Sequence, residues 1–197
     1  MNYNKWSENV IVVDVDFVDR VAFDLTVNFE RMLGRRIPQA DMARWLECVA
    51  LDGGLREGDH ETSVVLIHDK DKQRLQNFAP SQYEEELAGK AFKSTLGEFI
   101  INAVPVEAIT TKEDMVVDTM MFVARQEGVK RIMVVPDDRQ PEIFEHIRRS
   151  LQQVDDDKRI TVFAMQPLPG GNYRQEILGY SLMSALGIRG EELKGRG

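Results

Sequence analysis

Two pairs of aspartates follow apolar segments that are typical of buried strands. Asp14 and Asp16 end the first such segment, and Asp137 and Asp138 directly follow the fourth. Alternate residues of a strand point to the same side, so we expect Asp14 and Asp16 to face one side of the sheet. Burying an unpaired carboxylate is costly, and no local turn or cap accounts for Asp14. The two pairs therefore indicate a site that uses several carboxylates.

A further pair of acids precedes the fourth strand. Asp114 and Asp118 lie one turn apart in a segment with helical spacing, so they share a face. Four or more carboxylates brought together repel one another unless a cation binds them. Ligands that are all oxygen atoms select Mg²⁺ or Mn²⁺, and such an ion activates water and neutralises charge on a phosphoryl group. The sequence thus predicts a divalent-cation site.

Ordinary structural roles compete with this interpretation. Asp114 suits the first turn of a helix, where the helix dipole favours an acid. Asp138 could cap the helix that follows it, and Asp16 could accept a hydrogen bond from a loop amide. Asp118 could pair with a neighbouring side chain. Asp14 has the weakest structural explanation and is the strongest candidate for chemistry.

Basic side chains are expected near the same edge of the sheet. Lys70, Lys72 and Arg74 follow the second strand, either as a solvated loop or in contact with a phosphate backbone. Lys112 begins the helix that carries Asp118 and could contact an anion. Together with Asp138, it completes the supporting set around the predicted carboxylate site.

The composition is that of an ordinary globular protein. The chain has 197 residues, 43% hydrophobic and 29% charged, which is enough for one well-buried domain and short for two. Its net charge of −8 argues against general attraction to nucleic acid or anionic membranes. Cys48 is the only cysteine, so disulfides and thiolate zinc clusters are excluded. No segment has a signal-peptide pattern or membrane-spanning length, and we expect a cytoplasmic location.

Strand and helix patterns alternate along the chain. Strands are expected at residues 10–17, 63–69, 98–104, 131–136 and 159–165, and helices at 18–33, 38–52, 83–96, 111–127, 141–151 and 177–186. This alternation predicts an α/β fold, a three-layer α/β/α sandwich with a five-stranded, mostly parallel sheet in the order 3-2-1-4-5. Strands one and four are then neighbours, and ligands bind at the switch point between them. We expect one domain over residues 1–190 and a flexible C-terminal tail over 191–197.

The motifs resemble those of the NYN branch of the PIN-like nucleases. The matching parts, from about residue 8 to 165, are the strand with Asp14-x-Asp16, the helix start from Lys112, and the strand ending at Asp137. The resemblance implies a PIN-like, Rossmann-like fold, RNA as the substrate, and Mg²⁺ or Mn²⁺ as the cofactor of a ribonuclease. The metal and catalytic site that it implies consists of Asp14, Asp118 and Asp137, with Asp16 and Asp114 in support.

Two residues depart from the NYN pattern. Phe17 stands near the position of its usual asparagine, and Arg139 replaces the second aspartate of the pattern at the fourth strand. A site that lacks a ligand can bind a substrate without cleaving it. A catalytically inactive PIN-like binding module is therefore an alternative function.

The first motif is also similar to that of the haloacid-dehalogenase-like phosphatases. Four apolar residues precede Asp14-x-Asp16, Asp137 and Asp138 match the final acidic motif of that family, and Lys112 matches the lysine before it. This resemblance implies that Asp14 is a nucleophile and Asp16 the general acid and base.

Three features argue against the phosphatase. The second strand ends in His68 and Asp69 where that family has Ser or Thr, and Phe17 replaces its frequent glycine. The first helix also begins too early for the usual flap. A flap after the first strand and Lys112 beside Asp14 would favour the phosphatase, whereas an open carboxylate groove would favour the nuclease.

Overall fold

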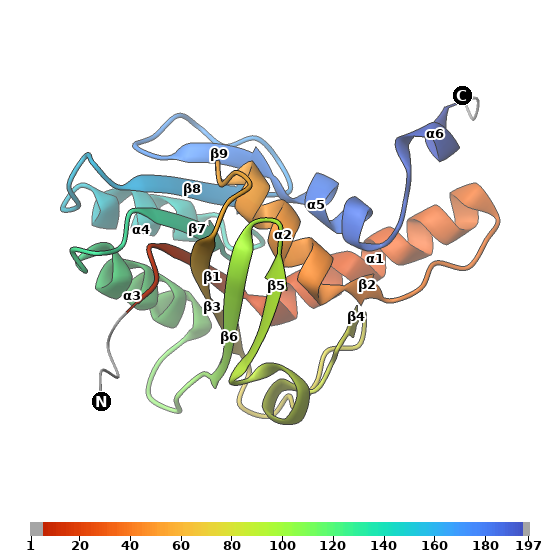
Figure 1. Cartoon of the computed structure of the whole chain (residues 1–197), viewed down its shortest axis with the longest axis horizontal. Helices are drawn as coiled ribbons and strands as arrows, with labels where there is room; N and C mark the ends of the chain where they lie inside the picture. The colour runs from red at the N-terminus through yellow and green to blue at the C-terminus, as the bar shows by residue number, and fades with distance from the viewer. Residues whose placement is uncertain (1–5, 195–197) are drawn as a thin grey trace.

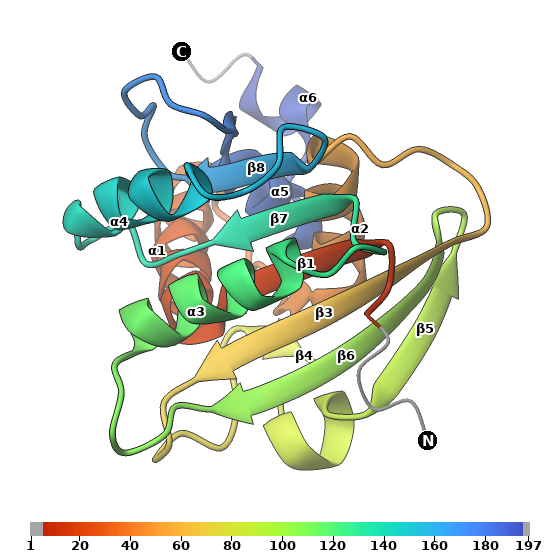
Figure 2. The same ribbon diagram turned by 90° about the vertical axis from the view of Figure 1, so that its left-hand side faces the viewer.

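The computed structural model describes residues 6–194, and its centre is a seven-stranded sheet. The strand order is β5-β6-β3-β1-β7-β8-β9, and only the β5–β6 pair is antiparallel. The parallel strands point the same way in Figure 2, so their carboxyl ends form one edge. The strands are β1 (Asn9–Asp14), β3 (His60–His68), β5 (Lys90–Ser94), β6 (Gly97–Pro105), β7 (Arg131–Val135), β8 (Arg159–Ala164) and β9 (Arg174–Ile177), and a separate two-stranded sheet pairs β2 (Ala40–Asp41) with β4 (Phe78–Ala79).

The five predicted strands are present in the predicted order, as β6-β3-β1-β7-β8. The predicted number of strands is wrong, because β9 and β5 extend the two edges of the sheet. The helix expected over residues 83–96 is also wrong. Only a π-helical turn, η1 (Tyr83–Leu87), forms there, and β5 follows it as the partner of β6. The Phe92 ring stacks on Phe99 across this hairpin, with centroids 4.8 Å apart, which favours a strand pair over a helix.

Helices cover both faces of the sheet and make three layers (Figures 1 and 2). Side chains of β1 alternate between the two cores: Ile11 and Val13 join one, and Val10 and Val12 join the other. A strand buried on both faces suits this continuous run of apolar residues. The first core packs against α1 (Val15–Leu33), α2 (Met42–Asp52) and α5 (Leu178–Ala185), and the second packs against α3 (Lys112–Ala124) and α4 (Glu142–Leu151).

The starts of three helices show how local sequence sets their bounds. Asp14 is the N-cap of α1 and accepts a hydrogen bond from the Phe17 amide, so β1 ends at Asp14. The expected strand as far as residue 17 is therefore wrong. Helix α2 is capped by Asp41, so Pro38 is not in its first turn. Helix α3 begins after its cap, Thr111, as its capping signature predicts.

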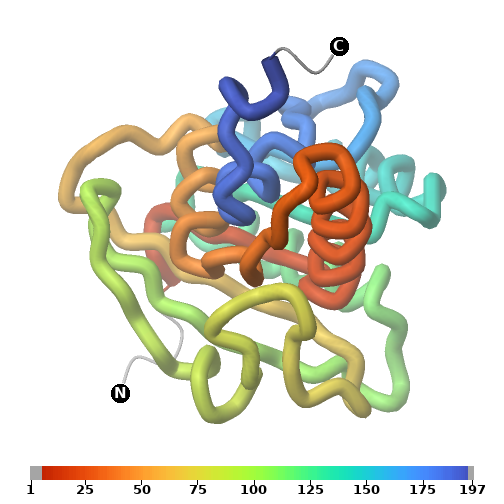
Figure 3. Tube along the Cα trace, turned by 90° about the vertical axis from the view of Figure 1, so that its right-hand side faces the viewer, coloured from red at the N-terminus to blue at the C-terminus, as the bar shows by residue number. Residues whose placement is uncertain are grey.

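The C-terminal segment returns to the first helix. Residues 190–193 form the short helix α6 (Gly190–Leu193), and the chain here lies near the end of α1 (Figures 1 and 3). Glu192 accepts a hydrogen bond of 2.8 Å from Arg35, just after α1. The flexible tail expected from residue 191 is thus helical at its start, and residues 195–197 lie outside the described part. Among the described helices, none is long and apolar enough to cross a membrane.

Candidate functional site

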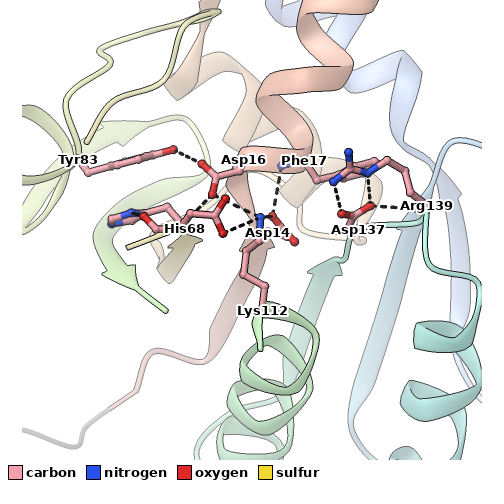
Figure 4. A network of polar contacts seen from close by, with 9 residues as sticks. Asp14, Asp16, Phe17, His68, Tyr83, Lys112, Asp137 and Arg139 are labelled. Atoms are coloured by element: carbon pink, nitrogen blue, oxygen red, sulfur yellow. Dashed lines mark hydrogen bonds and ion pairs between the residues drawn. The ribbon is translucent and has the colours of Figure 1, made fainter. Parts of the chain in front are cut away.

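The ammonium group of Lys112 lies among three carboxylates at the carboxyl edge of the sheet. Its Nζ atom is 3.4 Å from Asp14 Oδ1, 3.5 Å from Asp16 Oδ2 and 3.3 Å from Asp69 Oδ1. Each acid comes from a different place: the end of β1, the first turn of α1, and the residue after β3. Figure 4 shows Lys112 rising from the start of α3 toward this group. The fold thus gathers one cation and three anions at the predicted edge.

Asp14 is nearly inaccessible to solvent, with a relative exposure of 2%. Burial, aided by the nearby charges of Asp137 and Asp16, raises the pKa of its carboxyl group to about 6. Lys112 and the hydrogen bond from the Phe17 amide act in the opposite direction and do not cancel the rise. Asp14 is therefore a carboxylate that takes up a proton near neutral pH.

The charge of Lys112 survives its partial burial. Burial lowers the pKa of the amine, but the carboxylates of Asp14, Asp16 and Asp69 outweigh this effect and raise the pKa above its usual value. Lys112 is therefore a fixed positive charge, which the three acids share.

Asp16 is held by hydrogen bonds on both of its oxygens. Oδ1 accepts from the Tyr83 hydroxyl at 2.9 Å, and Oδ2 accepts from the Asp69 amide at 2.6 Å. The Tyr83 ring stacks on His68, with centroids 3.9 Å apart (Figure 4). Asp16 is in helix α1 and not on the strand, so the shared strand parity with Asp14 is wrong although the two acids lie together. The alternative role of Asp16, a bond to a loop amide, is what the structure shows.

Asp137 forms an ion pair with Arg139. Arg139 Nε and Nη2 donate to its two oxygens at 2.9 and 2.5 Å, and the Arg139 amide donates at 3.0 Å. Burial raises the pKa of Asp137, but these hydrogen bonds outweigh it, so the pKa lies below its usual value. The Arg139 guanidinium also lies 5.8 Å from the centroid of the Phe17 ring. The two departures from the NYN pattern, Phe17 and Arg139, are thus in contact.

Other predicted site residues lie at the margin of this group. Asp138 Oδ2 accepts from the Met165 amide at 2.8 Å, so it links the ends of β7 and β8 and does not cap α4, which Pro141 precedes. Asp118 is exposed on α3 and does not line the cavity of Asp14. Asp114 stands in the first turn of α3, where ligand atoms of Asp114, Glu113 and His146 lie within 4.8 Å of one another.

Three cavities follow one another along the edge. One of about 340 Å³ is lined by Asp14, Lys112 and Asp137, among others. A second, of about 180 Å³, also contains Lys112 and adds Arg20, Lys72 and the acids on the other side of the lysine. The third, of about 500 Å³, shares Lys72 and gathers the basic cluster of Lys70, Lys72 and Arg74. Neighbouring cavities along this edge thus share lining residues, and we refer to the three together as the groove.

Sequence reasoning missed three residues of this group. Asp69 was placed at the end of the second strand but not in the site, although that strand lies beside the first in the predicted order, which was a usable signal. Tyr83 was assigned to an apolar helix face, and no feature of the sequence indicates its bond to Asp16. Arg20 is one residue of α1 among many charged ones, and only the fold places it in the groove.

Comparison with known proteins gives one match. No curated protein and no solved structure matches the chain. A profile described as a family of unknown function matches residues 3–193, which is nearly all of the chain. The protein therefore belongs to the DUF6621 family.

Proposed function

We propose that this protein hydrolyses phosphodiester bonds of RNA with the help of Mg²⁺ or Mn²⁺ bound between Asp14 and Asp137. One observation carries the proposal. Two carboxylates from neighbouring parallel strands line the same cavity at the switch point of the sheet, and their pKa values are moved in opposite directions. Pairs of acids whose environments separate their pKa values in this way are typical of acid–base chemistry.

The cavity would offer one hard cation two carboxylates from neighbouring strand ends. Asp14 and Asp137 offer carboxylate oxygens, and the charge of Asp137 contributes to the raised pKa of Asp14. A bound cation removes that repulsion, and Mg²⁺ needs only one or two protein carboxylates because it keeps several waters. Asp118 is not needed in this arrangement, since it is exposed on α3. When bound, the ion would neutralise charge on the phosphoryl group and favour ionisation of the attacking water.

The remaining side chains of the site orient the carboxylates and offset their charge. Arg139 keeps Asp137 ionised and fixes its orientation. Asp14 Oδ1 accepts a hydrogen bond from the Phe17 amide, which orients the carboxylate that would hold the ion together with Asp137. Lys112 offsets the negative charge that Asp14, Asp16 and Asp69 present to an anionic substrate.

The shape of the edge supports a long substrate. Helix α1 begins at the residue after Asp14, so no flap is inserted between β1 and this helix. The groove runs from the carboxylates to the basic cluster of Lys70, Lys72 and Arg74, which suits a phosphate backbone. Arg20 adds a further positive charge within the groove.

The test is cleavage of an end-labelled RNA of mixed sequence in the presence of Mg²⁺ or Mn²⁺. We expect the wild-type protein to cleave it and Asp14→Asn to abolish cleavage. Asp156→Asn is the matched control, because Asp156 is exposed in the turn before β8 and remote from the groove. No cleavage with either ion, or undiminished cleavage by Asp14→Asn, would overturn the proposal. RNA binding without cleavage would instead support the inactive binding module.

One observation favours a second candidate, a phosphomonoesterase with Asp14 as nucleophile. Lys112 lies beside both Asp14 and Asp16, as the phosphatase resemblance requires. Against it, both oxygens of Asp16 already accept hydrogen bonds, from Tyr83 and from the Asp69 amide, which fix the carboxylate in place. This candidate predicts hydrolysis of p-nitrophenyl phosphate and a fluoroberyllate adduct on Asp14. Absence of both would remove it.

A further inference from the structure

A cavity of about 490 Å³ lies beside the groove, at the carboxyl end of β8. Its walls are the start of α4, the end of β8, and the loop over residues 166–173. Most of the lining is apolar or aromatic, and it includes Pro141, Phe144, Met165, Leu168 and Tyr173. A concave, largely apolar surface with a few polar groups is typical of a small-ligand site.

Asp138 joins this cavity to the carboxylates. It lines the cavity, and its neighbour Asp137 lines the one shared with Asp14. The Cα atoms of two consecutive residues are about 3.8 Å apart. The hydrogen bond from the Met165 amide to Asp138 also fixes the far wall to the end of β7. The walls of the two cavities therefore meet at consecutive residues of the chain.

The loop that closes the cavity is held in place by side chains. Gln175 accepts a hydrogen bond from the Leu168 amide at 2.9 Å and donates one to the Pro169 carbonyl at 3.0 Å. Asn172 donates to the Arg148 carbonyl at 3.2 Å, which ties the loop to α4. A cavity that is already formed binds its ligand with little ordering of the protein.

We infer that this cavity binds the nucleobase of the nucleotide next to the phosphate at the carboxylate site. The inference rests on the proposed function and adds the source of substrate affinity. Phe144 and Tyr173 provide aromatic rings, and Arg148 provides a guanidinium plane, on which a base of any sequence can stack. Arg148 is oriented by its ion pair with Glu145.

The charge of the protein supports a role for stacking. With a net charge of −8, the chain has weak general attraction for a phosphate backbone. Base stacking does not depend on attraction to the phosphates, because it acts on the apolar faces of the base. A stacked base would hold the adjacent phosphate at the carboxylates with few phosphate contacts.

The test uses binding, so that it does not depend on catalysis. Short single-stranded RNAs carrying one abasic site, moved along the sequence, are titrated against full-length Asp14→Asn protein. Gly170 lines the cavity, and a Cβ added there meets nothing within 4 Å, so Gly170→Trp adds a bulky ring at the cavity wall without a clash at the backbone. Gly128→Trp is the matched control, because Gly128 is equally open and exposed but does not line the cavity.

With RNAs too short for a second binding register, we expect removal of one base to weaken binding about tenfold, at one position only. Gly170→Trp should abolish this dependence, Tyr173→Ala should reduce it, and Gly128→Trp should leave it unchanged. A base dependence that survives Gly170→Trp, or no dependence at any position, overturns the inference. Cleavage of the intact RNA by the wild-type protein, which keeps Asp14, is measured separately. Cleavage without a base effect overturns the nucleobase site alone, and a base effect without cleavage overturns the hydrolase alone.

Discussion

The two aspartate pairs at the carboxyl edge of the sheet are divided in the same way. In each pair one acid, Asp14 or Asp137, lines the shared cavity. The other accepts a hydrogen bond from a backbone amide just past the neighbouring strand: Asp16 from Asp69 beyond β3, and Asp138 from the residue after β8. Each strand end thus carries one acid that lines the cavity and one that links neighbouring strand ends by a hydrogen bond.

The two cavity-facing acids differ in their counter-ions. Asp137 forms an ion pair with Arg139, and the pKa of Asp137 is lowered. Asp14 shares Lys112 with two other carboxylates and is more deeply buried, and its pKa is raised to about 6. Two acids near the ends of neighbouring strands thus differ: one stays ionised, and the other exchanges its proton near neutral pH.

The largest expected effect concerns the cavity-facing acids. Asp14→Asn and Asp137→Asn should each reduce RNA cleavage by about 10³-fold, because each removes a charged oxygen from the reacting centre. Asp118→Asn should change the rate by less than about threefold. The measurement is the rate of cleavage at saturating Mg²⁺. An Asp118→Asn loss as large as that of Asp14→Asn would favour the three-ligand site expected from the sequence.

The second effect is on stability, and it has the opposite sign. The pKa of Asp14 is raised from 3.8 to about 6 on folding, so the folded state binds more protons in that window. The relative stabilisation is present below about pH 4 and is lost as the pH rises through about 6. Asp14→Asn should therefore stabilise the protein at pH 7 by roughly 3 kcal/mol at most. Asparagine is also a good N-cap, so helix α1 keeps its start.

Urea unfolding at pH 4 and pH 7 measures this effect. The gain of Asp14→Asn should be present at pH 7 and nearly absent at pH 4. Asp52→Asn is a useful control, because burial, with the charge of Glu176, also raises the pKa of Asp52 to about 6, away from the groove. It should stabilise in the same pH range and leave cleavage unchanged. Destabilisation by Asp14→Asn at pH 7 would show that Asp14 serves the fold.

Replacement of Asp16 or Asp138, the acids that link neighbouring strand ends, should instead destabilise the protein. Asp16→Ala should lower the free energy of unfolding by about 2 kcal/mol and Asp138→Ala by about 1 kcal/mol, because each leaves a backbone amide without its acceptor. Asp16→Ala also unpairs the Tyr83 hydroxyl, and the loss of its charge beside Asp14 offsets part of the damage. Chemical denaturation at pH 7 measures both. Equal losses for Asp138→Ala and Asp138→Asn would contradict the role of the Met165 bond.

The smallest effects are shifts in titration. In protein free of divalent ions, Lys112→Met should raise the pKa of Asp14, and Arg139→Ala should raise that of Asp137. Carboxyl carbon chemical shifts in an NMR titration report each acid separately. A larger change in the pKa of Asp137 on loss of Lys112 than on loss of Arg139 would contradict the assignment of Arg139 as the main counter-ion of Asp137.

The sequence predicted the parts of the fold that depend on local pattern. The order of the five central strands and the capped start of α3 are confirmed, because apolar strands separated by helices leave few arrangements. Strand β5 was missed because its apolar residues also fit a helical spacing. Its pairing with β6 across Gly97, which has φ +105, decides the structure.

The site was predicted in part for the same reason. Asp14 and Asp137 follow from strand order alone, since both end neighbouring parallel strands. The exposure of Asp118 depends on which face of α3 packs on the sheet, and that face carries Val117 and Met121. The Tyr83 and Arg139 contacts depend on loop geometry that no periodicity encodes.

Binding of Mn²⁺ tests the central claim most directly, because it does not require a substrate. Calorimetric titration of the wild-type chain should show one ion per protein, and Asp14→Asn and Asp137→Asn should each remove it, whereas His146→Ala should leave it unchanged. No binding by the wild-type chain, or binding lost with His146 and kept without Asp14, would place the metal chemistry elsewhere and contradict the account.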